Sequence, residues 1–214
     1  MKKLSSVLIA VIFTILFSGC ATTNPEPQQT LKVIQPLDIS KRKTMAVIPY
    51  DFKDNNTSYE GLESGLVDLT INSFFETKRF LLVERTKLKA VVQELQYSSS
   101  GMVDTENALK IGKHAGAEYV FIGAVTSINP IAKKHTIGIA YIDTKGFEVT
   151  IQGRIIDIEK GVVVASTTAK GKEEKTKKVA LGATTGSIAP DDTLIRMAFE
   201  KAVQLLANDL ASQL

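Results

Sequence analysis

The chain has 214 residues and 23.3 kDa, with 44% hydrophobic residues, 23% charged residues and a formal net charge of +3. This composition is that of a globular protein large enough to bury a core, and it excludes global disorder, collagen-like repeats and coiled coils. One cysteine excludes an intramolecular disulfide framework and Cys-x-x-Cys sites, and two histidines make a histidine-rich metal site a poor prediction. A net charge of +3 does not by itself indicate nucleic-acid binding.

The first residues have the organisation of an export signal. Lys2 and Lys3 precede an apolar stretch, residues 7–17, that is interrupted only by Thr14. These eleven residues are about half of the roughly 20 that a helix needs to span a bilayer. The basic start, short apolar stretch and small residues after it therefore predict a signal peptide rather than a membrane anchor.

Cys20, the only cysteine, ends the stretch LFSGC, which resembles the lipobox of bacterial lipoproteins. The resemblance implies cleavage between Gly19 and Cys20, removal of residues 1–19 and lipid attachment to the cysteine thiol. Phe17 departs from the usual leucine three positions before the cysteine, and a plain secretory signal with an incidental cysteine is the alternative. Ala21 stands where the best-known inner-membrane retention signal has aspartate, so the sorting rule implies the outer membrane, facing the periplasm.

Residues 20–43 are predicted to be the lipidated N-terminus and a tether, because they contain three prolines and little apolar periodicity. A flexible linker of about 20 residues has an r.m.s. reach of about 25 Å, which would keep the domain close to the membrane. Lys41, Arg42 and Lys43 end this segment. They are interpreted as a solvated flank, with contact to anionic headgroups as the alternative.

The first half of the domain alternates apolar runs typical of buried strands with segments of helical periodicity. The expected elements are a strand at 45–50, a helix at 61–77, a strand at 80–83, a helix at 86–96, a helix from 104 or 105 to 114, and a strand within 117–126. Pro49 is expected to end the first strand or to place it at an edge. This order favours an α/β fold with a sheet and flanking helices.

The second half is predicted to be mainly β-structure followed by one helix. Three β-like stretches occupy residues 137–142, 147–158 and 162–167, with a turn between the last two. Residues 170–178 then contain seven charged side chains in nine positions. Pro190 and Asp191 mark the start of a C-terminal helix that continues past Leu210.

No sequence motif for catalysis, cofactor binding or metal binding is present: phosphate loops, GxGxxG turns and GxSxG elbows are all missing. Polar residues that could take part in acid–base chemistry stand where turns, helix ends and ion pairs explain them. They are Asp51 with Asp54, Asp191 with Asp192, Glu84 with Arg85, His114 at a helix end and His135 in an expected hairpin loop. We therefore expect no enzymatic activity, no cofactor and no metal, with a hydrolase using Asp51 or Glu84 as a weak alternative.

An ordered series of short motifs runs through the domain: AVIPYDF at 46–52, FLLVER at 80–85, IGK at 111–113 and GAEYVFIG at 116–123. The series resembles the family of the curli production assembly/transport component, the CsgG-like lipoproteins, over about residues 44–166 and in outline over the last helix. The resemblance implies a periplasmic α/β domain at 44–214. Its mixed sheet, flanking helices and C-terminal helix would resemble an anticodon-binding domain.

In the type member of that family, subunits form a ring, and each contributes two β-hairpins to a shared outer-membrane pore for unfolded amyloid subunits. The matching regions here are about 127–149 and 167–190. Lys133, Lys134 and Pro130 interrupt the first region, and the charged run occupies the second, so neither has the apolar alternation of a membrane strand. A member that keeps the domain without spanning the membrane is therefore expected, with the pore as the alternative.

The resemblance implies an outer-membrane-anchored periplasmic lipoprotein of the curli assembly/transport type, acting in the assembly or secretion of cell-surface polymers. Its expected partners are the membrane, through the lipid on Cys20, other envelope or secreted proteins, and copies of itself, but not nucleic acid. The alternative is a lipoprotein binding module, without a pore, that activates or scaffolds an envelope enzyme such as a peptidoglycan synthase. The short tether, at most about 70 Å when fully extended, argues against that alternative.

Overall fold

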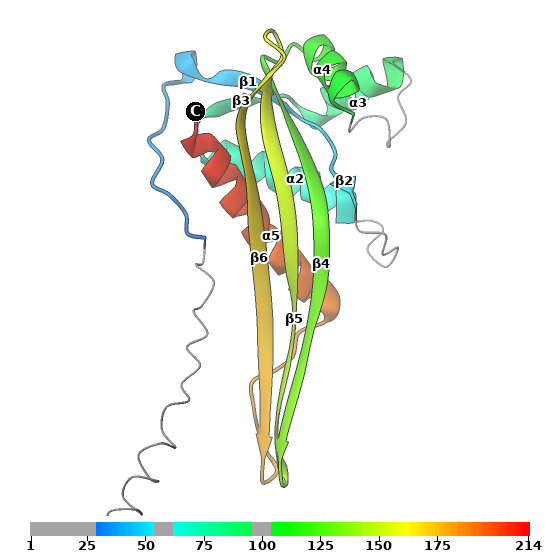
Figure 1. Ribbon diagram of the computed structural model, residues 1–214, viewed down its shortest axis with the longest axis vertical. Coiled ribbons are helices and arrows are strands. Elements are labelled where there is room, and N and C mark those ends of the chain that lie inside the picture. Colours follow the sequence, from blue (N-terminus) through cyan, green and yellow to red (C-terminus); the bar gives the residue numbers. More distant parts are fainter. Residues whose placement is uncertain (1–28, 54–61, 96–103) are drawn as a thin grey trace, which may run out of the picture.

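The computed structural model describes residues 29–53, 62–95 and 104–214 (Figure 1). The signal peptide, Gly19 and Cys20 lie outside the described residues, and so does Asp54. The described chain forms a head, in which helices flank a sheet, and a long three-stranded ribbon that projects from it (Figure 1).

The described strands form one mixed sheet of seven, in the order β3-β1-β4-β5-β6-β7, with β2 paired to β4. They are β1 Lys43–Val47, β2 Asp51–Phe52, β3 Phe80–Leu82, β4 Tyr119–Ile137, β5 Ala140–Asp157, β6 Val162–Ala180 and β7 Ala183–Thr185. The pairs β1–β3, β1–β4 and β2–β4 are parallel, and the pairs from β4 to β7 are antiparallel. The predicted α/β fold with a mixed sheet is confirmed.

Helices flank both faces of the sheet in the head (Figure 1). They are the short 3-10 helix η1 Ile39–Lys41 and the α-helices α2 Leu62–Glu76, α3 Arg85–Glu94, α4 Thr105–His114 and α5 Asp191–Ser212. One core cluster joins α2 and α5 to the sheet through residues such as Phe74, Phe121 and Leu206. A second cluster joins α3 and α4 to the other face through Leu88, Ile111 and Val120.

Helix α5 packs on β5 and β6 through a row of small and aliphatic side chains. Ala198, Ala202 and Leu206, spaced four residues apart, are fully buried and form one stripe of the helix. Gly171 of β6 lies directly beneath this stripe, and a Cβ built there would lie 2.0 Å from the carbonyl oxygen of Ala198. The absence of a side chain at residue 171 therefore lets the backbones of helix and strand approach each other.

The structure confirms the predicted helices and corrects the strands of the second half. Residues 137–142 are not a separate strand, because Gly138 and Ile139 form the two-residue turn between β4 and β5. The strand expected within 117–126 continues to Ile137, and Pro130 is tolerated because it lies where β4 has β5 as its only strand partner. The charged run at 170–178 belongs to β6.

A substitution at Gly171 tests the close packing of α5 on the ribbon. We expect Gly171→Ala to lower the free energy of unfolding by about 1–3 kcal/mol, because the added methyl group must push α5 away from β6. Gly65→Ala in α2 is the matched control, since a Cβ there meets no atom within 4 Å. That control is expected to be neutral or to stabilise by up to about 1 kcal/mol. Urea denaturation of both variants provides the measurement, and equal stability of the two would contradict the packing described.

Candidate functional site

The ribbon of β4, β5 and β6 is the most unusual feature of the described chain. Its strands pair almost without interruption, from Tyr119 opposite Asp157 to Ile137 opposite Ala140, and from Asp157 opposite Val162 to Tyr141 opposite Val179. Helix α5 covers only the part nearest the head, and the rest projects beyond it (Figure 1). We call residues 133–145 and 174–186 the distal ribbon.

Both outer edges of the ribbon are open over much of their length. Within the described chain, β4 has no strand on its outer side along residues 127–137, and β6 has none along residues 162–175. The β4 edge presents N–H and C=O groups to which a strand of another chain can pair. On β6, Gln213 already bonds the N–H and C=O of Ser166, and Lys201 donates to the carbonyl of Lys172. β6 carries several lysines, as protected edge strands commonly do, because charged side chains discourage unspecific pairing with other strands.

The N-terminal segment, residues 29–37, lies against α5 and the outer edge of β6. Gln29 donates a hydrogen bond from its side-chain nitrogen to the carbonyl of Thr168 (2.8 Å) and accepts one from the backbone N–H of Lys170 (3.1 Å). Its carboxamide therefore satisfies the same edge groups that a neighbouring strand would use. This segment was expected to belong to a tether, and its described part is docked on the domain.

Contacts with the last turns of α5 hold the same segment from its other side. The backbone of Lys32 donates to Asn208 (2.7 Å) and accepts from it (3.0 Å), and the Lys32 ammonium group forms an ion pair with Asp209. This ion pair is the main cause of a lowered pKa at Asp209. Farther along, the Leu37 N–H donates to the carbonyl of Lys78 (3.1 Å). The segment is thus fixed at several points along its length.

Glu173 is the one acidic side chain of β6 that points into the interface with α5, and it is buried. Its carboxylate forms ion pairs with Lys201 of α5 (2.5 Å) and with Lys175 (2.9 Å). These hydrogen bonds, the one from Lys201 first, lower the pKa of Glu173 despite its burial. The group therefore links helix and ribbon where the covered part of the ribbon ends.

Polar residues singled out in the sequence are not brought into one site. Asp51 lies in β2, Asp191 and Asp192 lie in the first turn of α5, and Glu84 precedes α3. Arg85 forms a two-oxygen ion pair with Asp68, at 2.6 and 2.7 Å. His114 ends α4, where its ring bonds the carbonyl of Lys110, and His135 lies in β4 rather than in a loop.

Two grooves accompany α5. The first, about 420 Å³, lies between the N-terminal segment, α2 and α5 and is lined by residues that include Ile34, Thr77 and Asn208. The second, about 370 Å³, lies between α2 and α5 beside Leu66, Arg196 and Phe199. Among the described residues, no group of three or more His, Cys, Asp or Glu side chains is placed to hold a metal ion. In that same part of the chain, no helix is both long enough and apolar enough to cross a bilayer.

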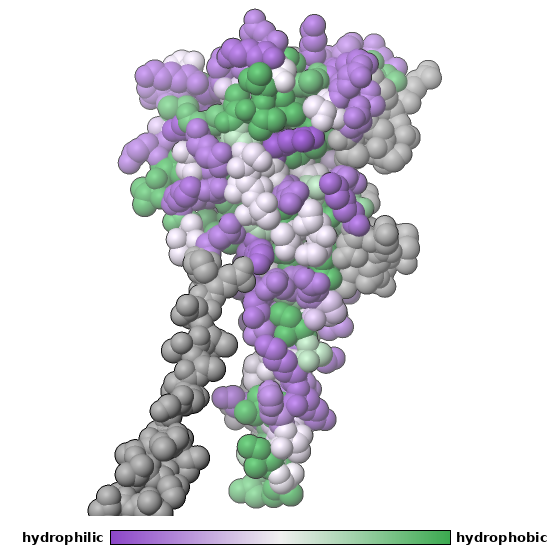
Figure 2. All heavy atoms as spheres, viewed as in Figure 1, coloured by the Kyte–Doolittle hydropathy of each residue, from purple (hydrophilic) through white to green (hydrophobic). Residues whose placement is uncertain are grey.

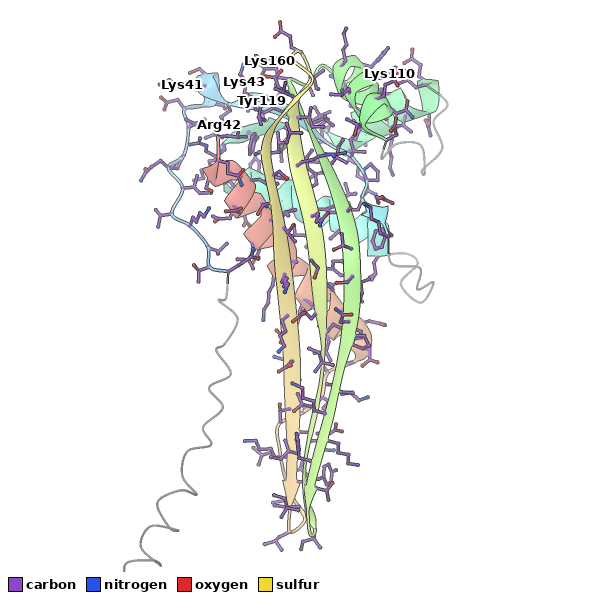
Figure 3. All side chains as sticks on the ribbon, in the orientation of Figure 1. Lys41, Arg42, Lys43, Lys110, Tyr119 and Lys160 are labelled. Atoms are coloured by element: carbon purple, nitrogen blue, oxygen red, sulfur yellow. The ribbon has the colours of Figure 1, made fainter. Side chains whose placement is uncertain are left out.

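The basic flank that ends the N-terminal segment lies at the head, opposite the free end of the ribbon (Figure 3). Lys43 forms an ion pair with Glu118, which raises the pKa of Lys43, and Arg42 donates to the carbonyl of Leu37. Lys160, at the same end, pairs with Asp157 (3.1 Å). The flank therefore takes part in contacts within the head.

The open edges of the ribbon and the docking of residues 29–37 were not predicted from the sequence. Long-range hydrogen bonds create the docking, since Gln29 and Thr168 are 139 positions apart and Lys32 and Asn208 are 176 apart. Only the run of lysines at 170–178 was a usable signal, because charges on a strand are typical of an exposed edge.

Comparisons with known proteins give one family match and several distant likenesses of fold. The model of the family described as "Curli production assembly/transport component CsgG" matches residues 27–214. No curated protein sequence matches the chain.

Solved structures give distant likenesses of fold. The LpoB C-terminal domain from Salmonella enterica is 15% identical, with 64% of this chain and 87% of that chain covered and a TM-score of 0.45. The lipoprotein GNA1162 from Neisseria meningitidis is 14% identical, with 72% and 91% covered and a TM-score of 0.47. The PelC dodecamer from Paraburkholderia phytofirmans is 12% identical, with 83% and 96% covered and a TM-score of 0.40.

The ion pairs of Glu173 make the stability of the domain sensitive to acid. Because the pKa of Glu173 is lower in the folded state, its contribution is present above the ordinary value of 4.5 and is lost as the pH falls through the lowered pKa. We expect Glu173→Gln to lower the free energy of unfolding at pH 7 by about 1–2 kcal/mol, a modest cost because the lysine partners are half exposed.

Urea unfolding at pH 7 and at pH 3 measures this effect, and the gap between the parent and Glu173→Gln should shrink at pH 3. Glu159→Gln, in the turn after β5, is the control for loss of one surface charge. A gap that stays constant with pH would rule out the ion pairs as its source.

Proposed function

The chain belongs to the family of the curli production assembly/transport component CsgG, and from this membership we propose an outer-membrane lipoprotein that faces the periplasm. It acts in the assembly or secretion of cell-surface polymers, as a protein-binding and self-associating component without catalytic activity. The observation that carries the proposal is the family match over residues 27–214, joined to the export signal that precedes it.

The proposed anchor is a lipid on Cys20, after cleavage behind Gly19. Gln29 is already bonded to β6, so only residues 21–28 separate the anchor from the domain. Nine residue steps span at most about 32 Å. The domain is therefore held beside the membrane, which disfavours the alternative of an activator that must reach a distant envelope enzyme.

The proposed mode of self-association is pairing of the open ribbon edges between copies. Residues 127–137 of β4 and 162–175 of β6 lack a strand partner on two sides of the same ribbon. Two different edges on one subunit produce head-to-tail contacts, which close into a ring when the rotation between copies allows it. Side chains already bond the β6 edge, Gln29 at Thr168 and Lys170, Gln213 at Ser166 and Lys201 at Lys172, so pairing there must displace them.

Loss of the cysteine tests the anchor. We expect Cys20→Ser, expressed with its own signal, to move the protein from the outer-membrane fraction to the soluble periplasmic fraction, because one thiol carries all the proposed lipid. Mass spectrometry of the parent should show a diacylglycerol-modified N-terminal cysteine. Ala21→Ser is the matched control and should stay membrane-bound. A parent protein without lipid would contradict the proposal.

A proline substitution tests self-association through the β4 edge. Pro130 already lies in this strand, and Ala132, two residues on, has its backbone N–H on the same edge. We expect Ala132→Pro to lower the oligomer mass of the detergent-extracted protein while leaving its folded spectrum unchanged. Ala132→Thr, which keeps the N–H, is the control. Native mass spectrometry gives the masses, and a parent that is monomeric at every concentration would overturn the oligomer.

A further inference from the structure

The free end of the ribbon is apolar. Ile137 and Ile139 of the β4–β5 turn are 83% and 75% exposed, and Leu181 of the β6–β7 turn is 84% exposed. Figure 2 shows hydrophobic residues gathered at this end of the molecule. We call residues 137–142 and 179–183 the tip. Three large side chains at one end form a cluster, which differs from the single exposed apolar residues of ordinary surfaces.

Leu181 has a positive φ, a backbone conformation that is unfavourable for leucine. Its φ is 50°, and Gly182 follows with φ 82°, so the two residues form a turn in which both have positive φ. Asn-Gly is the usual sequence of such turns, because a leucine side chain crowds the backbone there. Leu181 is both strained and exposed, so neither its conformation nor burial within the chain explains a leucine at this position.

The distal ribbon around the tip is strongly basic. It carries six lysines and two acids, a formal charge of +4: Lys133, Lys134, Lys145, Lys175, Lys177 and Lys178 against Asp143 and Glu174. Removal of residues 1–19 takes two lysines and leaves 24 basic against 23 acidic residues, so the mature chain has +1 and everything outside the distal ribbon has −3. Lys145 and Lys175 stand directly opposite each other across β5 and β6, and Lys175 is paired with Glu173.

The length of chain before Gln29 allows the tip and the proposed anchor to reach the same membrane. Gln29 is bonded at Lys170, eleven residues before Leu181, which corresponds to about 37 Å along the strand. Cys20 can lie up to about 32 Å from Gln29. When the linker extends in the same direction as the ribbon, Cys20 and the tip therefore lie at nearly the same distance from the Gln29 contact. This step rests on the proposed lipidation of Cys20, whereas the charge and exposure of the tip do not.

We propose that the tip binds an anionic lipid surface as a second, noncovalent membrane contact. Ile137, Ile139 and Leu181 enter the boundary between headgroups and acyl chains, while Lys134 of β4 and Lys178 of β6, the lysine nearest the tip on each strand, reach the lipid phosphates. The basic flank at Lys41–Lys43 does not share this role, because it lies at the head, where Lys43 pairs with Glu118 and Arg42 donates to the carbonyl of Leu37 (Figure 3). The ribbon thus meets the membrane end-on without crossing it.

Flotation with vesicles tests the proposal on the mature chain, residues 20–214, carrying Cys20→Ser so that no lipid is attached. We expect it to bind vesicles of phosphatidylglycerol and phosphatidylcholine, to bind phosphatidylcholine alone much more weakly, and to be released by salt. Leu181→Asn should weaken binding at least tenfold while unfolding at an equal or higher temperature, because asparagine removes the apolar contact and suits the turn. A variant that binds weakly because it is destabilised would also unfold at a lower temperature. The unfolding temperature therefore distinguishes a lost membrane contact from a damaged fold.

Val163→Asn is the matched control, since Val163 is a 54% exposed residue of the same strand at the opposite end of the ribbon. It should bind like the parent. Failure of the parent to bind the anionic vesicles, or equal binding by Leu181→Asn, would overturn the proposal. The proposal would also be overturned if the tip only joined copies of the chain. In that case the parent would not bind vesicles, and Leu181→Asn would lower the mass of its oligomer. None of these outcomes depends on the cellular fractionation of the lipidated protein. That fractionation, with Cys20→Ser, tests the anchor separately.

Discussion

The approach of α5 to the sheet at Gly171 is the constraint on which the rest of the structure depends. It lets one helix bury the near half of β5 and β6 against Ala198, Ala202 and Leu206. The helix has 22 residues and a length of about 33 Å, whereas β6 has 19 residues and a length of about 63 Å. One helix cannot cover such a strand, so the covered and uncovered halves of the ribbon follow from these two lengths.

The boundary between the two halves is visible in β6 itself. Buried positions alternate along the strand up to Glu173, the last that faces α5, and its carboxylate needs Lys201 and Lys175 as partners because it is out of water. Beyond it the strand carries lysines and ends at the exposed Leu181. The ladder of hydrogen bonds therefore holds the distal ribbon in shape without a core of its own.

The sequence predicted the head well because its elements bury one face or stripe. Residue types typical of helix starts, Asp104 for α4 and Pro190 for α5, and apolar spacing identified these helices, although neither residue makes a side-chain cap hydrogen bond. Periodicity did not reveal the distal ribbon, since a strand that is wet on both faces loses its alternation. Hairpins near 127–149 and 167–190 were expected only from the family resemblance. The docking of Gln29 was not predicted because it depends on partners far along the chain, whereas the prediction of lipid attachment at Cys20 rests on a local sequence signal.

The open edges and the apolar tip lie on the same ribbon, so the two proposed contacts support each other. Pairing of β4 and β6 edges between copies would align the ribbons and bring every tip to one level. A single tip presents only Ile137, Ile139 and Leu181 to a membrane, which alone gives weak binding. Tips linked in one assembly bind as a set, because each contact raises the effective concentration of the next. Membrane contact would in turn hold the copies parallel, which favours edge pairing over unspecific aggregation.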